Sequence, residues 1–157
     1  MSTQDVSIQQ EDFDVRALQL ALTQGDLAIG AVVNFVGLVR AGHKDGQIEY
    51  MELEHYPGMT ERSIQSIVDE AKQRWNVAAA TVVHRVGRLT PGSQIVYVGV
   101  SGTHRGESFQ ACEFIMDYLK TQAPFWKKET TAEGAHWVDA RESDESAARR
   151  WKSISPI

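Results

Sequence analysis

Apolar residues recur at a spacing of three to four in four segments of the chain, which predicts four α-helices. These segments span residues 14–24, 59–75, 106–122 and 144–151. Gly25 and Pro124 suit the ends of the first and third helices, and Ser143 suits the N-cap of the last. In the third helix, the side chains predicted to face the core are those of Phe109, Cys112, Met116 and Leu119.

Continuous or alternating apolar runs predict the strands, which fall at residues 28–40, 47–56, 78–86 and 94–101, with a hairpin formed by 125–130 and 136–138. The first run is predicted to be a long buried strand, and Gly37 marks a bulge or bend within it. A polar, glycine-containing loop is expected at 40–46. Helices and strands in this order favour an α+β fold with a mostly antiparallel sheet.

Length and composition limit the class of protein. The chain has 157 residues, 42% of them hydrophobic and 24% charged, which is typical of one globular domain. Cys112 is the only cysteine, so no intrachain disulfide forms, which fits a reducing compartment. The N-terminus lacks the pattern of a secretory signal, and the longest apolar stretch, residues 28–39, is too short to span a bilayer. We therefore expect a soluble, cytoplasmic protein.

The charge distribution favours a small anionic ligand over a nucleic acid. The net charge is −5, whereas nucleic-acid binders usually carry a basic face. Cationic residues nevertheless cluster at residues 40–44, 104–105, 120 and 127–128. His104 and Arg105 precede the third helix, where free backbone N–H groups attract anions. An N-cap at Thr103 with two solvated basic side chains explains the same spacing, slightly better from the pattern alone.

Lys120 lies at the border of the apolar face of the third helix. Such a lysine either packs its stem and keeps its ammonium in water, which is the commoner outcome, or lines a pocket as a base or nucleophile. Because Pro124 ends the helix, the chain can return alongside it and bring Lys127 towards Lys120, with the intervening Phe-Trp pair as apolar walls. The alternative is that Lys127 and Lys128 form an exposed basic pair.

The other candidate residues carry weaker signals. Arg40 ends the first long strand, and strand ends are common places for ligand groups. The histidines show no metal-ligand spacing, and His84, within a strand, is interpreted as a hydrogen-bonded core residue. Cys112 is interpreted as a small hydrophobe. We expect no metal and no cofactor, and these residues by themselves do not name a reaction.

A longer motif is much more specific. The run Met116 to Glu129, MDYLKTQAPFWKKE, closely resembles the large, catalytic subunit of molybdopterin synthases, the MoaE family. So do residues 34–40, the His-Arg pair at 104–105 and residues 137–142. The chain, 1–157, is identified as a single domain of that family. The resemblance covers about 14–151, and 1–5 and 152–157 are expected to be flexible tails.

The resemblance implies an α/β hammerhead with an additional, mostly antiparallel β subdomain. It implies a sulfurtransferase that converts cyclic pyranopterin monophosphate to molybdopterin, in molybdenum cofactor biosynthesis. The two dithiolene sulfurs are implied to come from the C-terminal Gly-Gly thiocarboxylate of a small ubiquitin-like carrier. The resemblance also implies that two large subunits form a homodimer and that one carrier on each gives a heterotetramer. No nucleic acid or membrane is implied as a partner.

The resemblance also implies the site residues. Lys120 and Lys127 are the implied catalytic pair, with Lys120 favoured for proton transfer or for attack at the terminal carbonyl of the carrier. Arg141 is implied to reach the site of the other subunit. Substrate binding is implied for Leu38, Val39, Arg40, His104, Arg105, Lys128, Glu129 and Arg141.

Two alternatives from other classes stay open. A module that docks a ubiquitin-like protein without chemistry predicts that Lys120→Ala leaves carrier binding intact and that neither version forms product. A phosphate-ester enzyme using His104 and Arg105 predicts activity on simple phosphate esters without a protein partner. The sequence disfavours the second alternative, because it shows no metal ligands and no nucleophile beside a base.

Overall fold

The computed structural model describes residues 5–43, 46–138 and 142–153, which form two β-sheets and four α-helices. The helices are α1 (Val15–Thr23), α2 (Met59–Arg74), α3 (Arg105–Thr121) and α4 (Glu142–Arg149), and a 3-10 helix, η1 (Arg150–Ser153), follows α4. The strands are β1 (Val6–Gln9), β2 (Ala31–Leu38), β3 (Gly42–His43), β4 (Gly46–His55), β5 (Val77–Arg85), β6 (Gly87–Leu89), β7 (Gln94–Gly102), β8 (Phe125–Thr131) and β9 (Gly134–Val138).

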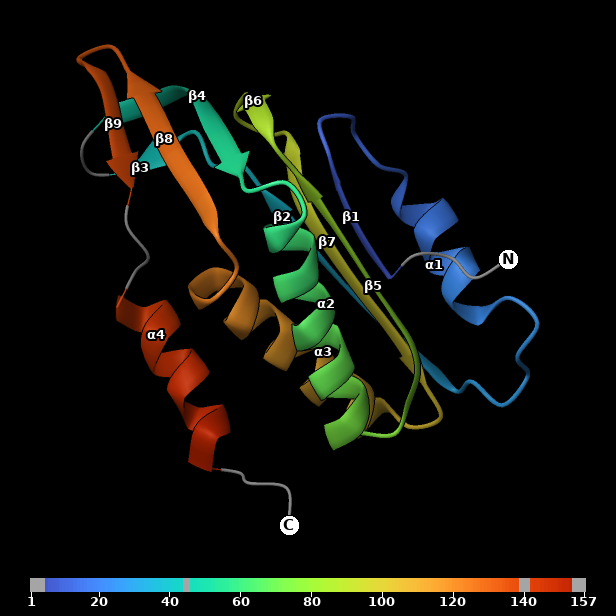
Figure 1. Cartoon of the computed structure of the whole chain (residues 1–157). Coiled ribbons are helices and arrows are strands. Elements are labelled where there is room, and N and C mark those ends of the chain that lie inside the picture. The colour runs from blue at the N-terminus through green and yellow to red at the C-terminus, as the bar shows by residue number, and fades with distance from the viewer. Residues whose placement is uncertain (1–4, 44–45, 139–141, 154–157) are drawn as a thin grey trace.

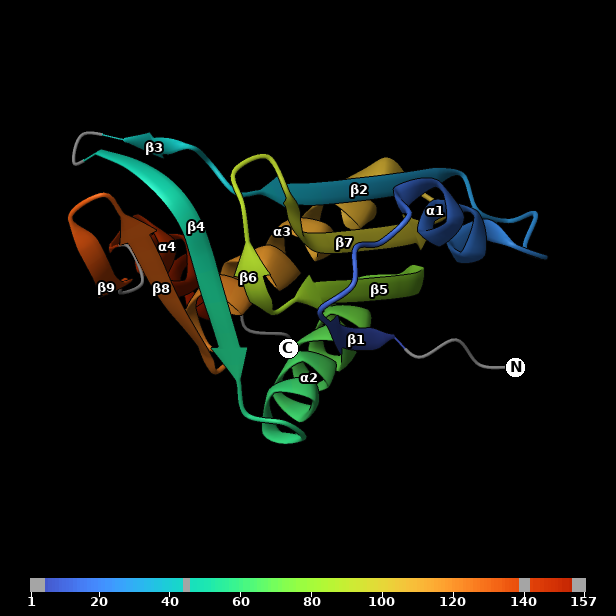
Figure 2. The same cartoon turned by 90° about the horizontal axis from the view of Figure 1, so that it is seen from above.

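The two sheets occupy different ends of the molecule (Figure 1). The first has the strand order β1-β5-β7-β2, and the second has the order β3-β4-β8-β9, with β6 alongside β4. β1 pairs with β5 in parallel, and the other pairs in the described part of the chain are antiparallel. Figure 2 shows β2 at one border of the first sheet. The α+β class with mostly antiparallel strands is therefore confirmed.

Helices cover both faces of the first sheet. On one face, α2 and α3 pack their apolar stripes on the alternate residues Ala80 and Val82 of β5 and Val98 and Val100 of β7. On the other face, α1 packs on residues such as Tyr97. A further cluster of buried side chains lies in the second sheet and its connections: Val39, Met51, Leu53, Val86 and Leu89. Burial of these apolar surfaces is the main force that holds each layer together.

Most predicted elements are confirmed, and the N-terminus of α1 shows why. Asp14 caps this helix, since its carboxylate accepts hydrogen bonds from the backbone N–H groups of Arg16 and Ala17. The bulge predicted at Gly37 is present, because the register between β2 and β7 shifts between Gly37 and Leu38. The predicted hairpin is β8 and β9, turning at Gly134.

Several boundaries and faces were predicted wrongly. The run 28–40 is not a long buried strand, because β2 is shorter, lies at the sheet border and is only partly buried. His104, not Thr103, is the N-cap residue of α3, and it makes no side-chain cap bond. α4 begins at Glu142, so Ser143 lies inside the helix. Phe109 is 58% exposed and does not face the core.

Short strands were also missed. β1, β3 and β6 each have two to four residues, too few for a periodic pattern to be recognised. β3 falls within the segment predicted to be a loop at 40–46. None of the helices in the described residues is long and apolar enough to cross a membrane.

Candidate active site

A pocket lies where the two sheets approach each other, and it receives residues from both. Its cavity of about 110 Å³ can hold several water molecules or a group of similar size. The residues that line it are Leu38, Arg40, Gly42, Ile48, Met51, Ile95, Lys120, Lys127 and Glu129. Five of these, namely Leu38, Arg40, Lys120, Lys127 and Glu129, were predicted as site residues.

The convergence of the two lysines follows from how the chain turns after α3. Lys120 stands in the last turn of α3, and β8 begins only four residues after that helix ends. The turn is held by a hydrogen bond from the Thr60 hydroxyl to the Pro124 carbonyl oxygen, 3.0 Å long. β8 then runs antiparallel to β4 and carries Lys127 into the pocket. The prediction that the chain returns and brings Lys127 to Lys120 is confirmed.

The charges in the pocket favour an anion. Arg40, Lys120 and Lys127 contribute three cationic groups, against the single carboxylate of Glu129. Glu129 is only 7% exposed, and its Oε2 lies 3.9 Å from Nε2 of His136. Arg40 and Lys120 are exposed. A concave site with two more positive than negative side chains attracts phosphate or carboxylate groups.

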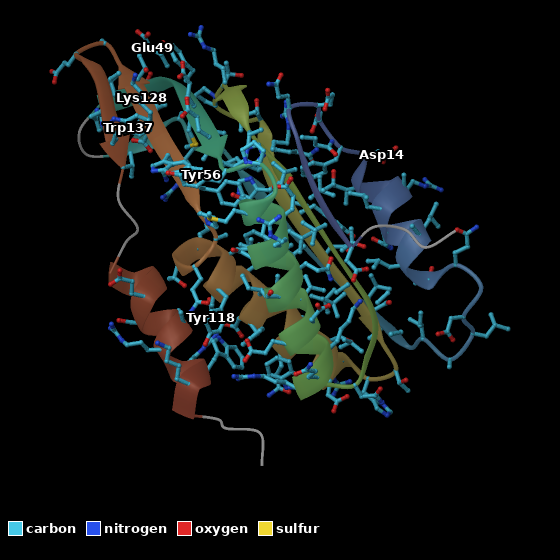
Figure 3. All side chains as sticks on the ribbon, viewed as in Figure 1. Asp14, Glu49, Tyr56, Tyr118, Lys128 and Trp137 are labelled. Atoms are coloured by element: carbon cyan, nitrogen blue, oxygen red, sulfur yellow. The ribbon has the colours of Figure 1, made fainter. Side chains whose placement is uncertain are left out.

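Strand alternation separates Lys128 from the pocket. Side chains of a strand point alternately to opposite faces, so Lys127 and Glu129 share one face of β8 and Lys128 occupies the other. The Lys128 ammonium lies 5.6 Å from the ring centre of Trp137 on β9, a cation–π contact on the hairpin (Figure 3). A role for Lys128 in substrate binding remains a prediction, and it requires contact from outside this pocket.

The predicted apolar walls beside Lys127 also lie elsewhere. Trp126 packs edge-on against Tyr56, with 4.1 Å between ring centres, on the face of the sheet opposite Lys127. Phe125 stacks on His84, with ring centres 4.0 Å apart. The walls are instead Ile48 and Met51 of β4 and Ile95 of β7, which no motif in the sequence singled out. They were recognisable only as apolar strand residues, a signal shared with every core strand.

His104 and Arg105 lie at the far end of α3 from Lys120. Both are exposed, and fifteen residues of helix separate Arg105 from Lys120, which corresponds to about 22 Å. One chain therefore cannot place these residues and Lys120 against the same small substrate. Val39 is buried beneath the pocket, where its backbone N–H donates to the Ser93 carbonyl oxygen. Arg141 lies outside the described residues.

Two titratable groups near the core are held neutral by burial. Burial raises the pKa of the Cys112 thiol to about 12, so at neutral pH it is not a thiolate nucleophile. Burial also lowers the pKa of His84 to about 4, and the nearby positive charge of Lys120 contributes. Nδ1 of His84 lies 2.8 Å from the Arg85 carbonyl oxygen, which confirms the interpretation of a hydrogen-bonded histidine. Among the described residues, no His, Cys, Asp and Glu side chains form a metal-binding group.

The fold and the pocket together define an α+β protein of two sheets with a lysine-lined anion site between them. The family model described as "MoaE protein" matches residues 8–122. The molybdopterin synthase catalytic subunit of Ralstonia nicotianae is 57% identical over 150 residues, covering 96% of this chain and 85% of that protein. Its counterpart in Escherichia coli is 57% identical over 122 residues, covering 78% and 81%.

Solved structures agree with this match. The MoaE protein of Burkholderia ambifaria superposes with a TM-score of 0.82 at 50% identity, covering 96% of this chain and 99% of that one. The molybdopterin synthase of Staphylococcus aureus gives a TM-score of 0.81 at 31% identity, covering 87% and 98%. The chain belongs to the MoaE family.

Proposed function

We propose that this chain is the catalytic subunit of a molybdopterin synthase. It would convert cyclic pyranopterin monophosphate to molybdopterin with two sulfurs delivered as the C-terminal thiocarboxylate of a small ubiquitin-like carrier. The observation that carries the proposal is the convergence of Lys120, Lys127 and Arg40 in one pocket. The chain is also 57% identical, over almost its whole length, to a protein of that name.

The pocket side chains suit the chemistry of sulfur transfer. The carrier thiocarboxylate sulfur bonds to a side-chain carbon of the pterin, and an oxygen group leaves that carbon with a proton, so that a thioester joins the pterin to the carrier. Water then attacks the carrier carbonyl and the carbonyl C–S bond breaks, which leaves the sulfur on the pterin as a thiolate and the carrier as a carboxylate. Lys120 is placed to move protons or to attack that carbonyl. Lys127 and Arg40 would stabilise the negative charge that develops and hold the substrate phosphate, because cations already held in place need little reorganisation during the reaction.

The carrier is the proposed protein partner, since the relatives are named as one subunit of an enzyme. An extended tail that ends in two glycines has no side chains at its tip, so it can enter a cavity of about 110 Å³ beside the lysines. We also propose that the chain acts as one domain and that the reaction takes place in the cytoplasm, which fits the single, buried cysteine.

His104 and Arg105 are proposed to serve the pocket of a second copy of the chain. None of the other described strands pairs with the outer edge of β2 (Figure 2). Ala31, at the start of β2, pairs with Gly102, close to His104, whereas Leu38, at its end, lines the pocket. Antiparallel pairing of β2 with its copy about a two-fold axis sets Ala31 of each chain opposite Leu38 of the other. The start of one α3 then lies beside the pocket of the partner.

The dimensions and exposed side chains support this arrangement. β2 spans about 26 Å, close to the 22 Å between Arg105 and Lys120. One antiparallel pairing of the two β2 strands therefore brings the start of each α3 beside the pocket of the other chain. Arg105, Phe109 and Lys120 lie within about 60° on one flank of α3. Phe109 and the β2 residue Phe35 are exposed apolar side chains. Contact with a second copy would bury them, which explains why Phe109 does not face its own core.

Reconstitution tests the proposed reaction. The purified chain, a thiocarboxylated carrier and cyclic pyranopterin monophosphate are combined, and the dithiolene pterin is measured. Loss of an acid–base or nucleophilic group at Lys120→Ala should lower the rate by about 100-fold or more. Lys152→Ala, which removes an exposed lysine of η1, is the matched control and should keep the wild-type rate. Carrier binding without product from the wild type would leave the docking module as the better account, whereas turnover of simple phosphate esters alone would favour the phosphate-ester enzyme.

Mixing two inactive variants tests the shared site. Lys120→Ala and Arg105→Ala chains are co-expressed with different tags so that mixed dimers form. A mixed dimer has one site in which both residues are intact, so an equal mixture should regain about a quarter of the wild-type activity. Lys120→Ala mixed with Lys127→Ala is the control and should regain nothing, because those two lysines belong to the same chain's pocket. No recovery in the first mixture would refute the shared site.

A further inference from the structure

The distance between the two pocket lysines depends on how the two sheets are joined. Lys120 belongs to α3, which packs on the first sheet through residues such as Ile115 and Leu119. Lys127 belongs to β8, which is paired with β4 and β9 in the second sheet. A shift of one sheet relative to the other would therefore move the two ammonium groups apart, even if each sheet kept its own structure.

Three apolar side chains in the described part of the chain connect the two cores. Ile8, Ile95 and Phe125 are partly buried there and pack against both the main core and the core of the second sheet. Of these three, only Phe125 belongs to the second sheet, and it stands two residues before Lys127 on β8. The position of the Phe125 ring is thus directly linked to the position of Lys127.

His84 of the first sheet stacks directly on this ring. It lies near the end of β5, where its neighbours in the sheet are Ile8 of β1 and Val96 of β7. Its imidazole stacks on Phe125 with 4.0 Å between centroids and 21° between planes. The Arg85 carbonyl oxygen, 2.8 Å from Nδ1, accepts a hydrogen bond from the protonated Nδ1 tautomer and fixes the ring orientation.

The environment keeps this imidazole neutral. Burial holds its pKa at about 4, and the positive charges of Lys120 on α3 and of His55 on β4, when protonated, act in the same direction. The hydrogen bond from Nδ1 to the Arg85 carbonyl opposes the shift but does not cancel it. At neutral pH the ring therefore meets Phe125 as a flat, uncharged surface, and it adds no further positive charge near the three cations of the pocket.

We propose that His84 is a positioning residue for sulfur transfer, which sets Lys127 relative to Lys120 through its stack on Phe125. This inference rests on the proposed function, because its readout is the synthase reaction. His84 does not line the pocket, and its stacking contact reaches Lys127 through Phe125 and β8. Misplacing a catalytic group by about 1 Å can cost about 100-fold in rate, so loss of the His84–Phe125 contact between the two sheets should lower turnover strongly.

The test compares four variants in the reconstituted complex at a temperature where urea unfolding shows each to be folded. His84→Ala removes the stack, and kcat should fall at least tenfold, with a smaller change in KM for the pterin. His84→Phe keeps a flat ring on Phe125 and should restore most of kcat. Val82→Ala removes a buried side chain from the same face of β5, two residues away, and should keep kcat within about twofold of the wild type. Phe125→Leu removes the stack from the other side and should behave like His84→Ala, which keeps the test valid if His84→Ala does not fold.

The outcomes separate this inference from the proposed function. A wild-type protein without synthase activity would remove the proposed function itself. An active wild type with normal kcat in His84→Ala, or in Phe125→Leu, would overturn only the positioning role. An equal loss of kcat in Val82→Ala would also overturn it, since the effect would then follow from general destabilisation. A loss in His84→Phe as large as in His84→Ala would show that the stack is not what positions the lysine.

Discussion

The C-terminal 3-10 helix packs on the rest of the protein through the ring of Trp151, beside the ion pairs of Arg150 with Glu113 and Asp117. The Trp151 side chain is only 4% exposed, and its ring packs edge-on against Trp75 and Phe114, with ring centres 5.4 and 5.7 Å away. Its indole Nε1–H donates a 2.7 Å hydrogen bond to the Asp117 carboxylate on α3. Its carbonyl oxygen accepts a 2.9 Å hydrogen bond from Arg74 on α2. Trp151 therefore joins the C-terminal segment to both helices of the main core.

Truncation of this side chain should strongly destabilise the fold. A buried Trp removes about 200 Å² from water, which at about 25 cal/mol per Å² gives an upper value of about 5 kcal/mol. Measured Trp→Ala changes in cores fall at about 3–5 kcal/mol, so we expect that range for Trp151→Ala. Trp151→Phe keeps most of the ring but loses the indole donor. Because Arg150 still donates to Asp117 at 3.0 Å, the carboxylate keeps a partner, and the cost should be only about 1–2 kcal/mol.

Equilibrium urea unfolding at pH 7, followed by fluorescence and by circular dichroism, measures both changes. The difference in unfolding free energy between Trp151→Ala and Trp151→Phe is the informative quantity, because it distinguishes the contribution of ring packing from that of the hydrogen bond. Asp117→Asn is a third variant that weakens the acceptor while Trp151 stays in place, and it should cost less than Trp151→Ala. The reasoning fails if Trp151→Ala loses less than about 1 kcal/mol, which would mean that η1 is not held by this contact.

Other regions of the molecule give further predictions. Gly99→Ala should destabilise the protein by about 1–3 kcal/mol in urea unfolding, because the added Cβ would overlap the Tyr97 hydroxyl. An unchanged unfolding midpoint would show that this packing is loose. The pKa of His84 is about 4 in the folded state and about 6.5 when unfolded, so the unfolded chain binds more protons between these values. The stability that comes from burying the neutral His84 is complete above about pH 6.5 and is lost as pH falls towards 4. The free energy of unfolding should therefore drop by at most about 2 kcal/mol from pH 7 to pH 5 because of this residue, and the drop should be shallower in His84→Phe. Cys112→Ala should keep synthase activity within about twofold, because burial raises the thiol pKa to about 12; a large loss of kcat in a stably folded variant would contradict an inert thiol.

The sequence predicted the long helices and strands and the convergence of Lys120 and Lys127, because these features depend on short-range signals in the chain. Pro124 must end the helix, and the hairpin that follows has a recognisable glycine turn, so the return of the chain was foreseeable. The period of a strand could also have shown that Lys127 and Lys128 face opposite sides of β8. The resemblance to the family nevertheless implied a role at the site for both lysines, Lys127 in catalysis and Lys128 in substrate binding.

Other features depend on contacts that the sequence does not contain. The parallel pairing of β1 with β5 joins segments more than seventy residues apart, and four residues carry no periodic signal. The length of α3 was readable, yet the consequence that Arg105 and Lys120 stand about 22 Å apart appears only when the pocket is located. Phe109 matched an apolar stripe, and only the position of α3 on the sheet shows that this flank is exposed.

The central place of β8 in the second sheet has a consequence for how the protein is made. Its pairing with β4 joins Leu53 to Lys127, 74 positions apart in the chain. During synthesis, the four strands of the first sheet and α3 have all left the ribosome before β8 emerges. Until β8 is synthesised, the edge of β4 that pairs with β8 is unpaired, and unpaired strand edges promote aggregation. The pocket is completed only when β8 joins β4, so a partly synthesised chain can have a folded first sheet and still lack the lysine pair.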